Sequence, residues 1–359
     1  MNRKFHLLTF ITLLLFISCN TNTKDKGNED TFIGLKIQGE AQGTTYTIIY
    51  LEDSTNYQTE IDSILTRYDQ DLSLWVPNSL LTQINNHERR DTVFSFYDST
   101  KYFSVIFDMS REIWKLTDGA FDPSVHPLVQ AWGFGLKNKE EITPELIDSL
   151  KELVGFSPFD ISINEIFKNK YIYDRTEVIK LSPNVKLDFN AIAQGHSIDV
   201  VSEFLDQKEI TNYMVEIGGE LYCKGLNQYN KPWGISIDKP DGESNSENYQ
   251  EIIEVTNKAV ATSGSYRKFY EKDGVKYSHT IDPNTGYPVT HSLLSATVIA
   301  DGCASADAYA TAFMVMGKDK SMEFVNNNPE LDLAIYLIYD NGGKFETVMS
   351  NNMKQYLKQ

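Results

Sequence analysis

Hydrophobic residues recur at every third or fourth position in five segments of the chain, and this spacing places them on one face of a helix. In the segment 97–116, for example, Phe103, Phe107 and Trp114 share one side. The same spacing predicts further helices over residues 58–68, 143–154, 190–205 and 304–316.

Shorter segments rich in β-branched and aromatic residues predict strands. Residues 32–51 form either a strand pair or one bent strand, and further strands are predicted at 171–181, 213–217, 233–237, 252–255, 258–263, 294–300 and 334–339. Neighbouring strands are close enough in the chain for antiparallel pairing. The pattern therefore favours an α+β fold, with antiparallel sheets flanked by helices, over a repeating βαβ sheet. No repeat or second linker follows Thr31, so we predict one large domain over residues 32–359, with 241–249 as a polar surface loop.

The N-terminus has the pattern of an export signal. A basic start at residues 2–4 precedes an apolar run over 7–17 that is too short to span a bilayer, and a small residue, Ser18, precedes Cys19. Residues 16–19 resemble a bacterial lipobox, which implies a lipoprotein signal peptide over 1–18 and lipidation of Cys19. An ordinary signal peptide that happens to contain a cysteine is the alternative. Residues 20–31 contain no apolar side chain, so 19–31 is predicted to be a flexible tether.

The charge of the chain limits its partners. A formal net charge of −17 argues against a nucleic-acid binder, because phosphate backbones are bound by surplus Lys and Arg. A phosphorylated ligand is still compatible with this charge if backbone N–H groups or a metal ion offset the ligand's negative charge. Apart from Cys19 the chain has two cysteines, Cys223 and Cys303, which are too few for a disulfide scaffold and are predicted to be buried thiols.

Several common enzyme motifs are missing from the sequence. It contains no G-x-G-x-x-G, no Walker A motif and no H-E-x-x-H, which argues against a Rossmann enzyme, a P-loop NTPase and a zincin. Residues 265–268 match the S-x-x-K of penicillin-binding enzymes, but no K-T-G accompanies them, so serine acyl transfer is not predicted.

A series of short Gly- and Asp-rich segments remains. Each one alone is typical of a turn. They are GTTY at 43–46, TDGAFDPS at 117–124, DFNAIAQG at 188–195, EIGG at 216–219, ATSGSY at 261–266, HTIDPNTGYP at 279–288 and ADAYAT at 306–311. In this order they resemble the ApbE family of FAD:protein FMN transferases over residues 37–317. The resemblance implies a T-fold-like domain that binds FAD with Mg²⁺, cleaves its pyrophosphate and transfers FMN to a Thr or Ser of a partner protein.

Asp307 and Thr311 are the centre of the predicted chemistry. They lie four positions apart on a predicted helix, so their oxygens share one face and can meet one hard cation. The alternative is an Asp near a helix start with a Thr packed one turn later. The resemblance implies that both are metal ligands, joined by the backbone carbonyl of Ala193. Mg²⁺ keeps waters and phosphate oxygens as its other ligands, so three protein ligands are enough.

Other segments are predicted to contact FAD. Glycine lets the backbone approach a ligand closely, which assigns Gly218 and Gly219, and Ser263 with Gly264, to the FAD groove, with plain turns as the alternative. Asp118 and Asp122 are candidates for contacts with the adenosine. The resemblance places residues 73–79 beside the nucleotide, where Trp75 can stack on a ring. The full set of predicted FAD contacts is Gln42, Gly43, Trp75, Asn78, Ser79, Asp118, Asp122, Gln194, Gly218, Gly219, Ser263, Gly264 and His279.

His279 is the candidate general base. The resemblance places it near the flavin phosphate, where an imidazole can accept the proton of the acceptor hydroxyl, and Asp282 can orient it. The alternative is a hydrogen-bonded structural histidine. The sequence departs from the family pattern at Gln194, where Lys is frequent, at His196, where Tyr is frequent, and at Gln42, where Met is usual. Gln194 removes a cation near the phosphates.

The resemblance leaves three functions to separate. Transfer of FMN to a D-x-x-(S/T)-G-A-(S/T) motif is the first, with a subunit of a Na⁺-translocating NADH:quinone reductase or an Rnf-type complex as an example of the acceptor. The second is an FAD pyrophosphatase that uses water, and the third is a lipoprotein that only binds flavin. In each case the protein is expected in the bacterial cell envelope, lipid-anchored to the membrane and facing the periplasm.

Overall fold

The computed structural model describes residues 34–87, 93–135, 141–157, 161–169, 172–180, 182–240, 249–265, 269–272, 275–278 and 280–358. Residues 33–359 form one compact unit. The predicted signal peptide, tether and Cys19 lie outside the described residues, as does His279. Among the residues described, no helix combines the length and the apolar character needed to cross a membrane.

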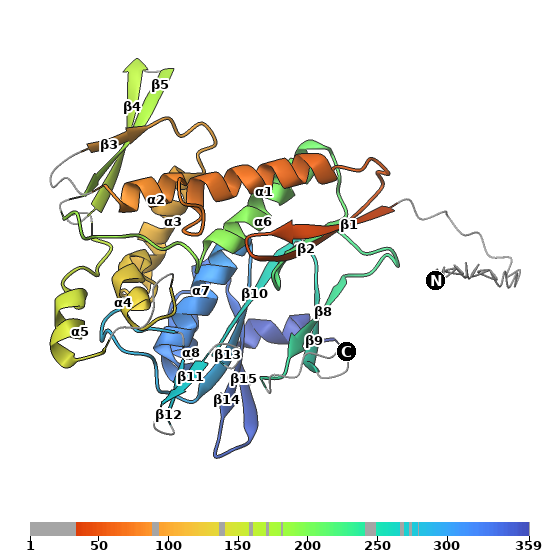
Figure 1. Ribbon diagram of the computed structural model, residues 1–359. Coiled ribbons are helices and arrows are strands. Elements are labelled where there is room, and N and C mark those ends of the chain that lie inside the picture. Colours follow the sequence, from red (N-terminus) through yellow and green to blue (C-terminus); the bar gives the residue numbers. More distant parts are fainter. Residues whose placement is uncertain are drawn as a thin grey trace, which may run out of the picture. The chain divides into compact units, whose positions relative to one another are not determined.

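The centre of the fold is an antiparallel sheet of eight strands (Figure 1). Its order is β1 (Gly34–Ala41), β2 (Thr44–Leu51), β6 (Tyr213–Ile217), β7 (Glu220–Lys224), β10 (Lys258–Gly264), β13 (Leu293–Ala300), β14 (Ala334–Asp340) and β15 (Phe345–Met349). Smaller antiparallel sheets are formed by β3 (Val93–Phe96), β5 (Ile172–Lys180) and β4 (Ile161–Asn169), by β8 (Trp233–Asp238) with β9 (Tyr249–Val255), and by β11 (Phe269–Lys272) with β12 (Val275–Ser278). The predicted α+β class with antiparallel sheets is confirmed.

The helices are α1 (Gln58–Leu72), α2 (Leu80–Asn85), α3 (Tyr102–Leu116), α4 (His126–Ala131), α5 (Pro144–Lys151), α6 (Ala193–Gln207), α7 (Cys303–Met316) and α8 (Lys318–Asn327). Short 3₁₀ turns cover Pro123–Val125, Pro329–Leu331 and Asn351–Tyr356. All five predicted helices are present. The start of α3 is later than predicted, because Asp98 precedes the helix and its carboxylate accepts the N–H of Ser104 (3.0 Å).

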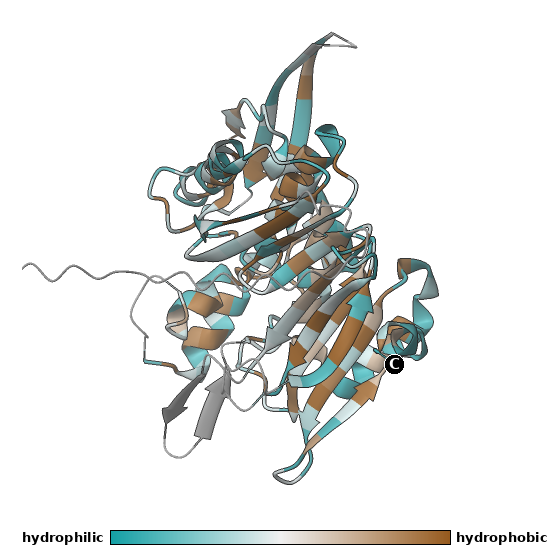
Figure 2. Cartoon of the chain, turned by 90° about the vertical axis from the view of Figure 1, so that its right-hand side faces the viewer, coloured by the Kyte–Doolittle hydropathy of each residue, from teal (hydrophilic) through white to brown (hydrophobic). Residues whose placement is uncertain are grey.

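The large sheet is covered on both faces. Successive side chains of a strand point to opposite faces, so Ala259 and Ala261 face the core that contains α6 and α7, while Val260 faces the core built with β8 and β9. Because both faces are covered, β13 and β14 are buried along nearly their whole length. Figure 2 shows the hydrophobic residues that run through these strands.

Helix α7 is rich in apolar residues and mostly buried, as expected for a helix in the interior. Its alanines at 304, 306, 308, 310 and 312 let it pack closely against its neighbours, and ten of its residues are buried. It packs against α6 and against the strands β10 and β13 of the large sheet (Figure 1). The two helices that carry the predicted metal ligands are therefore packed against each other.

Candidate functional site

The start of α6 lies against the start of α7 at Gly195. A Cβ at this position would lie 2.3 Å from the carbonyl oxygen of Cys303 and 2.9 Å from the backbone nitrogen of Ala304. Both are backbone atoms at the start of α7, so neither can move aside as a flexible side chain could. The N–H of Gly195 donates to Oδ2 of Asp307 (3.1 Å). Because Gly195 has no side chain, the start of α6 can lie directly against α7.

Asp307 is a buried carboxylate with 8% of its surface exposed. Burial raises its pKa well above the usual range, the N–H of Gly195 lowers it, and the negative charge of Asp199 raises it. One neutral N–H donor offsets only part of the cost of burying a charge. A cation beside Asp307 would offset more of that cost.

The three predicted metal ligands all offer oxygen donors. Thr311 lies one turn further along α7 on the same face and is half-buried, and Ala193 is the first residue of α6. A carboxylate, a hydroxyl and a backbone carbonyl are hard oxygen donors of the kind that Mg²⁺ binds. In the described part of the chain, no group of three or more His, Cys, Asp or Glu side chains is placed to hold a metal. That finding does not test the predicted site, since only one of its three ligands is of these types.

The turn between β6 and β7 lies against the start of α6. The Nε2 of Gln194 donates to the carbonyl oxygen of Ile217 and to Oε2 of Glu220, both at 2.6 Å. Gly218 has a φ of +64°, and a Cβ there would lie 2.0 Å from Nε2 of Gln194. Gly219 has a φ of +110° and no atom within 4 Å of a Cβ position. The turn therefore needs its glycines, and Gly219 leaves open space for a ligand.

The turn between β1 and β2 approaches the same place. The N–H of Gly218 donates to the carbonyl oxygen of Thr45 (3.0 Å), and the Ser197 hydroxyl lies 3.2 Å from Oε1 of Gln42. Nε2 of Gln42 is buried and has no hydrogen-bond partner among the described residues. Gly43 has a φ of +74° and open space around its Cβ position. The Gln42 amide nitrogen and the uncrowded backbone of Gly43 thus lie beside α6.

Strand β10 places Ser263 and Gly264 near the β6–β7 turn. Val260 pairs with Leu221 of β7, and β10 continues from there past the Gly218–Gly219 turn. The structure therefore gathers the predicted residues of five distant segments into one site, which we call the α6–α7 site. Its predicted members are Gln42, Gly43, Ala193, Gln194, Gly218, Gly219, Ser263, Gly264, Asp307 and Thr311.

Asp118 and Asp122 line a separate pocket of about 310 Å³. Asp122 accepts hydrogen bonds from the N–H of Ser124 (2.7 Å) and from Nε1 of Trp114 (3.0 Å). Burial raises its pKa to about 6, and these donors lower it. Asp122 is thus held in a local network. Asp118 has a φ of +50°, and its carbonyl accepts a hydrogen bond from Nδ2 of Asn284 (3.3 Å).

Asp282 lies in the loop that carries Asn284. Its Oδ1 accepts the N–H of Asn284 (2.9 Å), and its carbonyl accepts the N–H of Gly286 (2.8 Å). Asp282 therefore stabilises its own turn. The predicted pairing with His279 stays a prediction, because His279 is outside the described residues.

The segment 73–79 differs in exposure from one residue to the next. Trp75 is 64% exposed and Asn78 is exposed, so both can contact a ligand. Ser79 is 0% exposed. It is the N-cap of α2, where its hydroxyl accepts the N–H of Thr82 (3.0 Å) and donates to the carbonyl of Ser73 (2.6 Å). The geometry gives Ser79 a capping role, and its contact with FAD stays a prediction.

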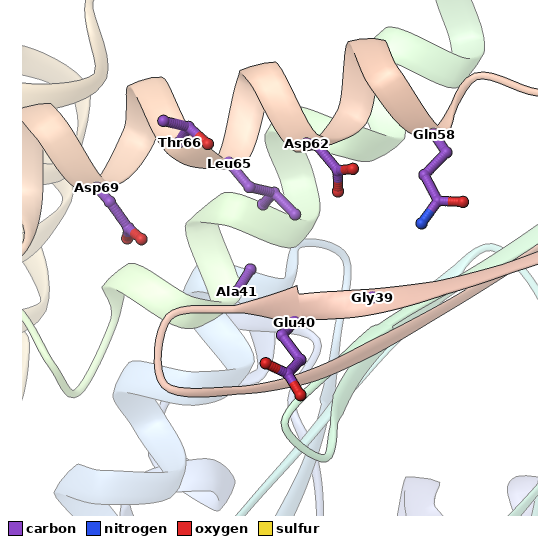
Figure 3. Close-up of a pocket in the computed structure, with 8 residues that line it drawn as sticks. All are labelled: Gly39, Glu40, Ala41, Gln58, Asp62, Leu65, Thr66 and Asp69. Carbon is purple, nitrogen blue, oxygen red and sulfur yellow. The ribbon is translucent and has the colours of Figure 1, made fainter.

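A further pocket of about 310 Å³ lies between α1 and β1 (Figure 3). None of the predicted site residues lines it. Asp62 projects into it from α1, and its Oδ1 already accepts a hydrogen bond from the Tyr46 hydroxyl (2.6 Å). Gln58, at the start of α1, donates to the carbonyl of Gln38 (2.8 Å). The partners of these two side chains are therefore within the protein.

Asp199 was not among the predicted site residues. It lies on α6 one turn after Gly195, and its carboxylate accepts the N–H groups of Cys303 (2.7 Å) and Ala304 (2.8 Å). Burial raises its pKa to about 6, and these two bonds lower it. Its spacing from Gly195 was the available signal, because two residues one turn apart share a helix face.

Comparisons with known proteins match this arrangement. The ApbE family model matches residues 42–335. The FAD:protein FMN transferase of Vibrio cholerae is 34% identical and aligns over 98% of each chain, and that of Escherichia coli K12 is 32% identical over 96% of this chain and 95% of that one. The solved flavin transferase ApbE of Vibrio cholerae superimposes with a TM-score of 0.76 at 34% identity, covering 91% of this chain and all of that one. The apo flavinyl transferase ApbE of Pseudomonas stutzeri gives 0.78 at 29% identity, with 90% and 97% covered.

Proposed function

The chain belongs to the ApbE family and is an FAD:protein FMN transferase, and we propose that it cleaves FAD with a Mg²⁺ ion held between α6 and α7. The observation that supports this most is the buried Asp307 carboxylate, which accepts the N–H of Gly195. The glycine turns at Gly43 and at Gly218–Gly219 lie beside it. Asp307, Thr311 and the carbonyl of Ala193 are the proposed ligands. Bound there, the ion would neutralise pyrophosphate charge and stabilise the displacement at phosphorus.

The residues around this site position the substrate. Gly43 and Gly219 have positive φ and open space where a side chain would be, so their backbones can lie against FAD. Gln194 fixes the Gly218–Gly219 turn with two hydrogen bonds of 2.6 Å. It carries no positive charge, so in this protein the phosphates depend more on the metal than on a side-chain cation.

The transfer joins FMN to the acceptor through a phosphoester. The acceptor hydroxyl oxygen attacks the phosphorus on the FMN side, the bond to the bridging oxygen breaks, and AMP leaves. The hydroxyl proton must go to a base, for which we propose His279, oriented by Asp282. The acceptor we propose carries the D-x-x-(S/T)-G-A-(S/T) motif, as a subunit of a Na⁺-translocating NADH:quinone reductase or Rnf-type complex would.

We further propose that Cys19 is lipidated and that the catalytic domain faces the periplasm on a tether of residues 19–31. The basic start, the short apolar run and the small residue before Cys19 support this. Two acyl chains on Cys19 would anchor the protein firmly, since each buried CH₂ contributes about 0.8 kcal/mol. Labelling with a radioactive fatty acid tests this, and an unlabelled Cys19→Ser variant is the expected control result. Equal labelling of both proteins would refute the anchor.

One assay tests this activity against the two alternatives, FAD hydrolysis and flavin binding alone. The full chain in mild detergent is incubated with FAD, Mg²⁺ and an acceptor protein that bears the motif, and AMP release and covalent flavin fluorescence are followed. We expect both signals. AMP without labelled acceptor would indicate a pyrophosphatase, and no AMP would indicate a protein that only binds flavin.

Two substitutions test the assigned roles in the same assay. We expect Asp307→Ala to abolish both signals, because it removes the only carboxylate among the proposed ligands. We expect His279→Ala to slow transfer, by about 10²-fold or more, if it is the base. Near-normal transfer by His279→Ala together with an inactive Asp307→Ala would remove the base assignment and retain the metal assignment.

A further inference from the structure

The N-terminus of α7 is capped by a residue of another helix. Gly302 is the N-cap of α7 and has no side chain to offer. The first backbone N–H groups of a helix need acceptors from elsewhere. Both oxygens of Asp199 on α6 fill this role, Oδ1 with the N–H of Cys303 (2.7 Å) and Oδ2 with that of Ala304 (2.8 Å).

A second hydrogen bond crosses between the same helices in the opposite direction. Asp307 of α7 accepts the N–H of Gly195 in the first turn of α6 (3.1 Å). Each helix therefore supplies a carboxylate to the N-terminal turn of the other, where the helix dipole favours negative charge. Together with the missing side chain at Gly195, these bonds prevent the helices from sliding along each other. The position of Asp307 relative to the start of α6 is set by this arrangement.

We propose that Asp199 is a positioning residue that holds α7 against α6, so that Asp307 and Thr311 meet the carbonyl of Ala193 around one metal ion. This inference rests on the proposed function and extends it to a residue that is not itself a ligand. Asp199 uses both carboxylate oxygens on α7, so its effect on the metal passes through the helix. Loss of a hydrogen bond made directly to a metal ligand typically costs about 10–100-fold in metal affinity, and we expect an effect of this order when the helix that carries two ligands is released.

The alternative is that Asp199 only stabilises α7 as a cap. The two roles separate in a double variant, because Gly302 has an extended backbone, and a Cβ there lies no closer than 3.6 Å to Asp199. A serine at 302 can therefore cap α7 locally. In Asp199→Asn/Gly302→Ser, α7 regains an N-cap from residue 302, but the two hydrogen bonds that join α7 to the Asp199 carboxylate of α6 are missing.

The experiment compares the full-length wild type with Asp199→Asn, the double variant and Asp98→Asn. Asp98 is the matched control, since it is a buried carboxylate that accepts the N–H of Ser104 at the start of α3, away from the metal ligands. Two quantities are measured against Mg²⁺ concentration. The first is the thermal unfolding midpoint with FAD present, and the second is the rate of AMP release.

We expect the Mg²⁺ concentration that gives half of the maximal change in midpoint and in AMP release to be about 10-fold or more higher for Asp199→Asn than for the wild type. The double variant should recover the midpoint measured without Mg²⁺ while keeping the weaker metal response. Asp98→Asn should lose stability and keep the wild-type Mg²⁺ dependence. The inference is overturned if Asp199→Asn responds to Mg²⁺ as the wild type does, or if Gly302→Ser restores the metal response together with stability.

If Asp199→Asn does not fold, the comparison is made between the double variant and the wild type, with the same criterion. A wild type that Mg²⁺ stabilises but that releases no AMP would refute the proposed reaction, and the unfolding midpoints would still decide the role of Asp199. A wild type with neither response would overturn both proposals.

Discussion

Gly195→Ala is the sharpest test of the α6–α7 crossing. The added methyl would lie 2.3 Å and 2.7 Å from the carbonyl oxygen and carbon of Cys303, and 2.9 Å from the nitrogen of Ala304. Ordinary contact begins at 3.4 Å, so the helices must separate by about 1 Å. Overpacking of this kind costs about 3 kcal/mol, and replacing Gly by Ala inside a helix returns about 1 kcal/mol. The expected net loss is about 2 kcal/mol, or roughly 3 °C in Tm for a chain of this size.

The effect on catalysis should be larger than the effect on stability. A displacement of about 1 Å in a catalytic arrangement can cost about 10²-fold in rate, because the reacting groups are no longer aligned. Gly234→Ala in β8 is the matched control, since no atom lies within 4 Å of its Cβ position. Thermal unfolding and AMP release are measured for both variants. If Gly195→Ala were as stable and as active as Gly234→Ala, the helices would not be in the contact described.

Three further predictions concern other residues. Burial lowers the pKa of His196 from 6.5 to about 4, so the unfolded chain binds more protons between these values. The free energy of unfolding therefore falls by on the order of 3 kcal/mol as the pH drops from 6.5 toward 4. Denaturant titrations should show a weaker pH dependence for His196→Gln than for the wild type, and an unchanged dependence would contradict this assignment. Gln194→Ala removes both hydrogen bonds to the β6–β7 turn and should raise the KM for FAD several-fold. Gln194→Lys can donate to the same two acceptors and should restore the KM, whereas a wild-type KM for Gln194→Ala would show that Gln194 does not position FAD. Burial raises the pKa of the thiols of Cys223 and Cys303, so a thiol reagent should label neither in the native protein and both after denaturation, and rapid native labelling would show the burial to be wrong.

Periodicity along the chain was sufficient to predict most of the elements. The strands β6 and β10 and the helix α7 begin and end within one residue of their predicted bounds. Among the described elements, the sequence pattern missed α2, α4, α8, β3, β4, β7, β11, β12 and β15. Most of these are short, and α8 consists mostly of polar residues. A short strand is recognised by its pairing partner more than by its own residues, so its sequence carries a weak signal.

The predicted site residues fall into three groups in space. The glycine turns and the ligands on α6 and α7 meet in the α6–α7 site, as their shared assignment to FAD and Mg²⁺ requires. Asp118 and Asp122 line another pocket, and Ser79 is buried as the cap of α2. A motif read in sequence gives no direction for a side chain, and the caps of short helices use the same residue types as ligand contacts.

The sequence by itself determined the fold class, the likeness to the ApbE family and the pairing of Asp307 with Thr311, because helical and strand periods and motif order are local properties of the chain. Only the tertiary structure showed that Asp199 caps α7 and that Gly195 has no room for a methyl group. These two contacts join segments about a hundred residues apart, and they depend on how two helices cross. The angle and distance of that crossing come from the packing of the whole core, which no local pattern encodes.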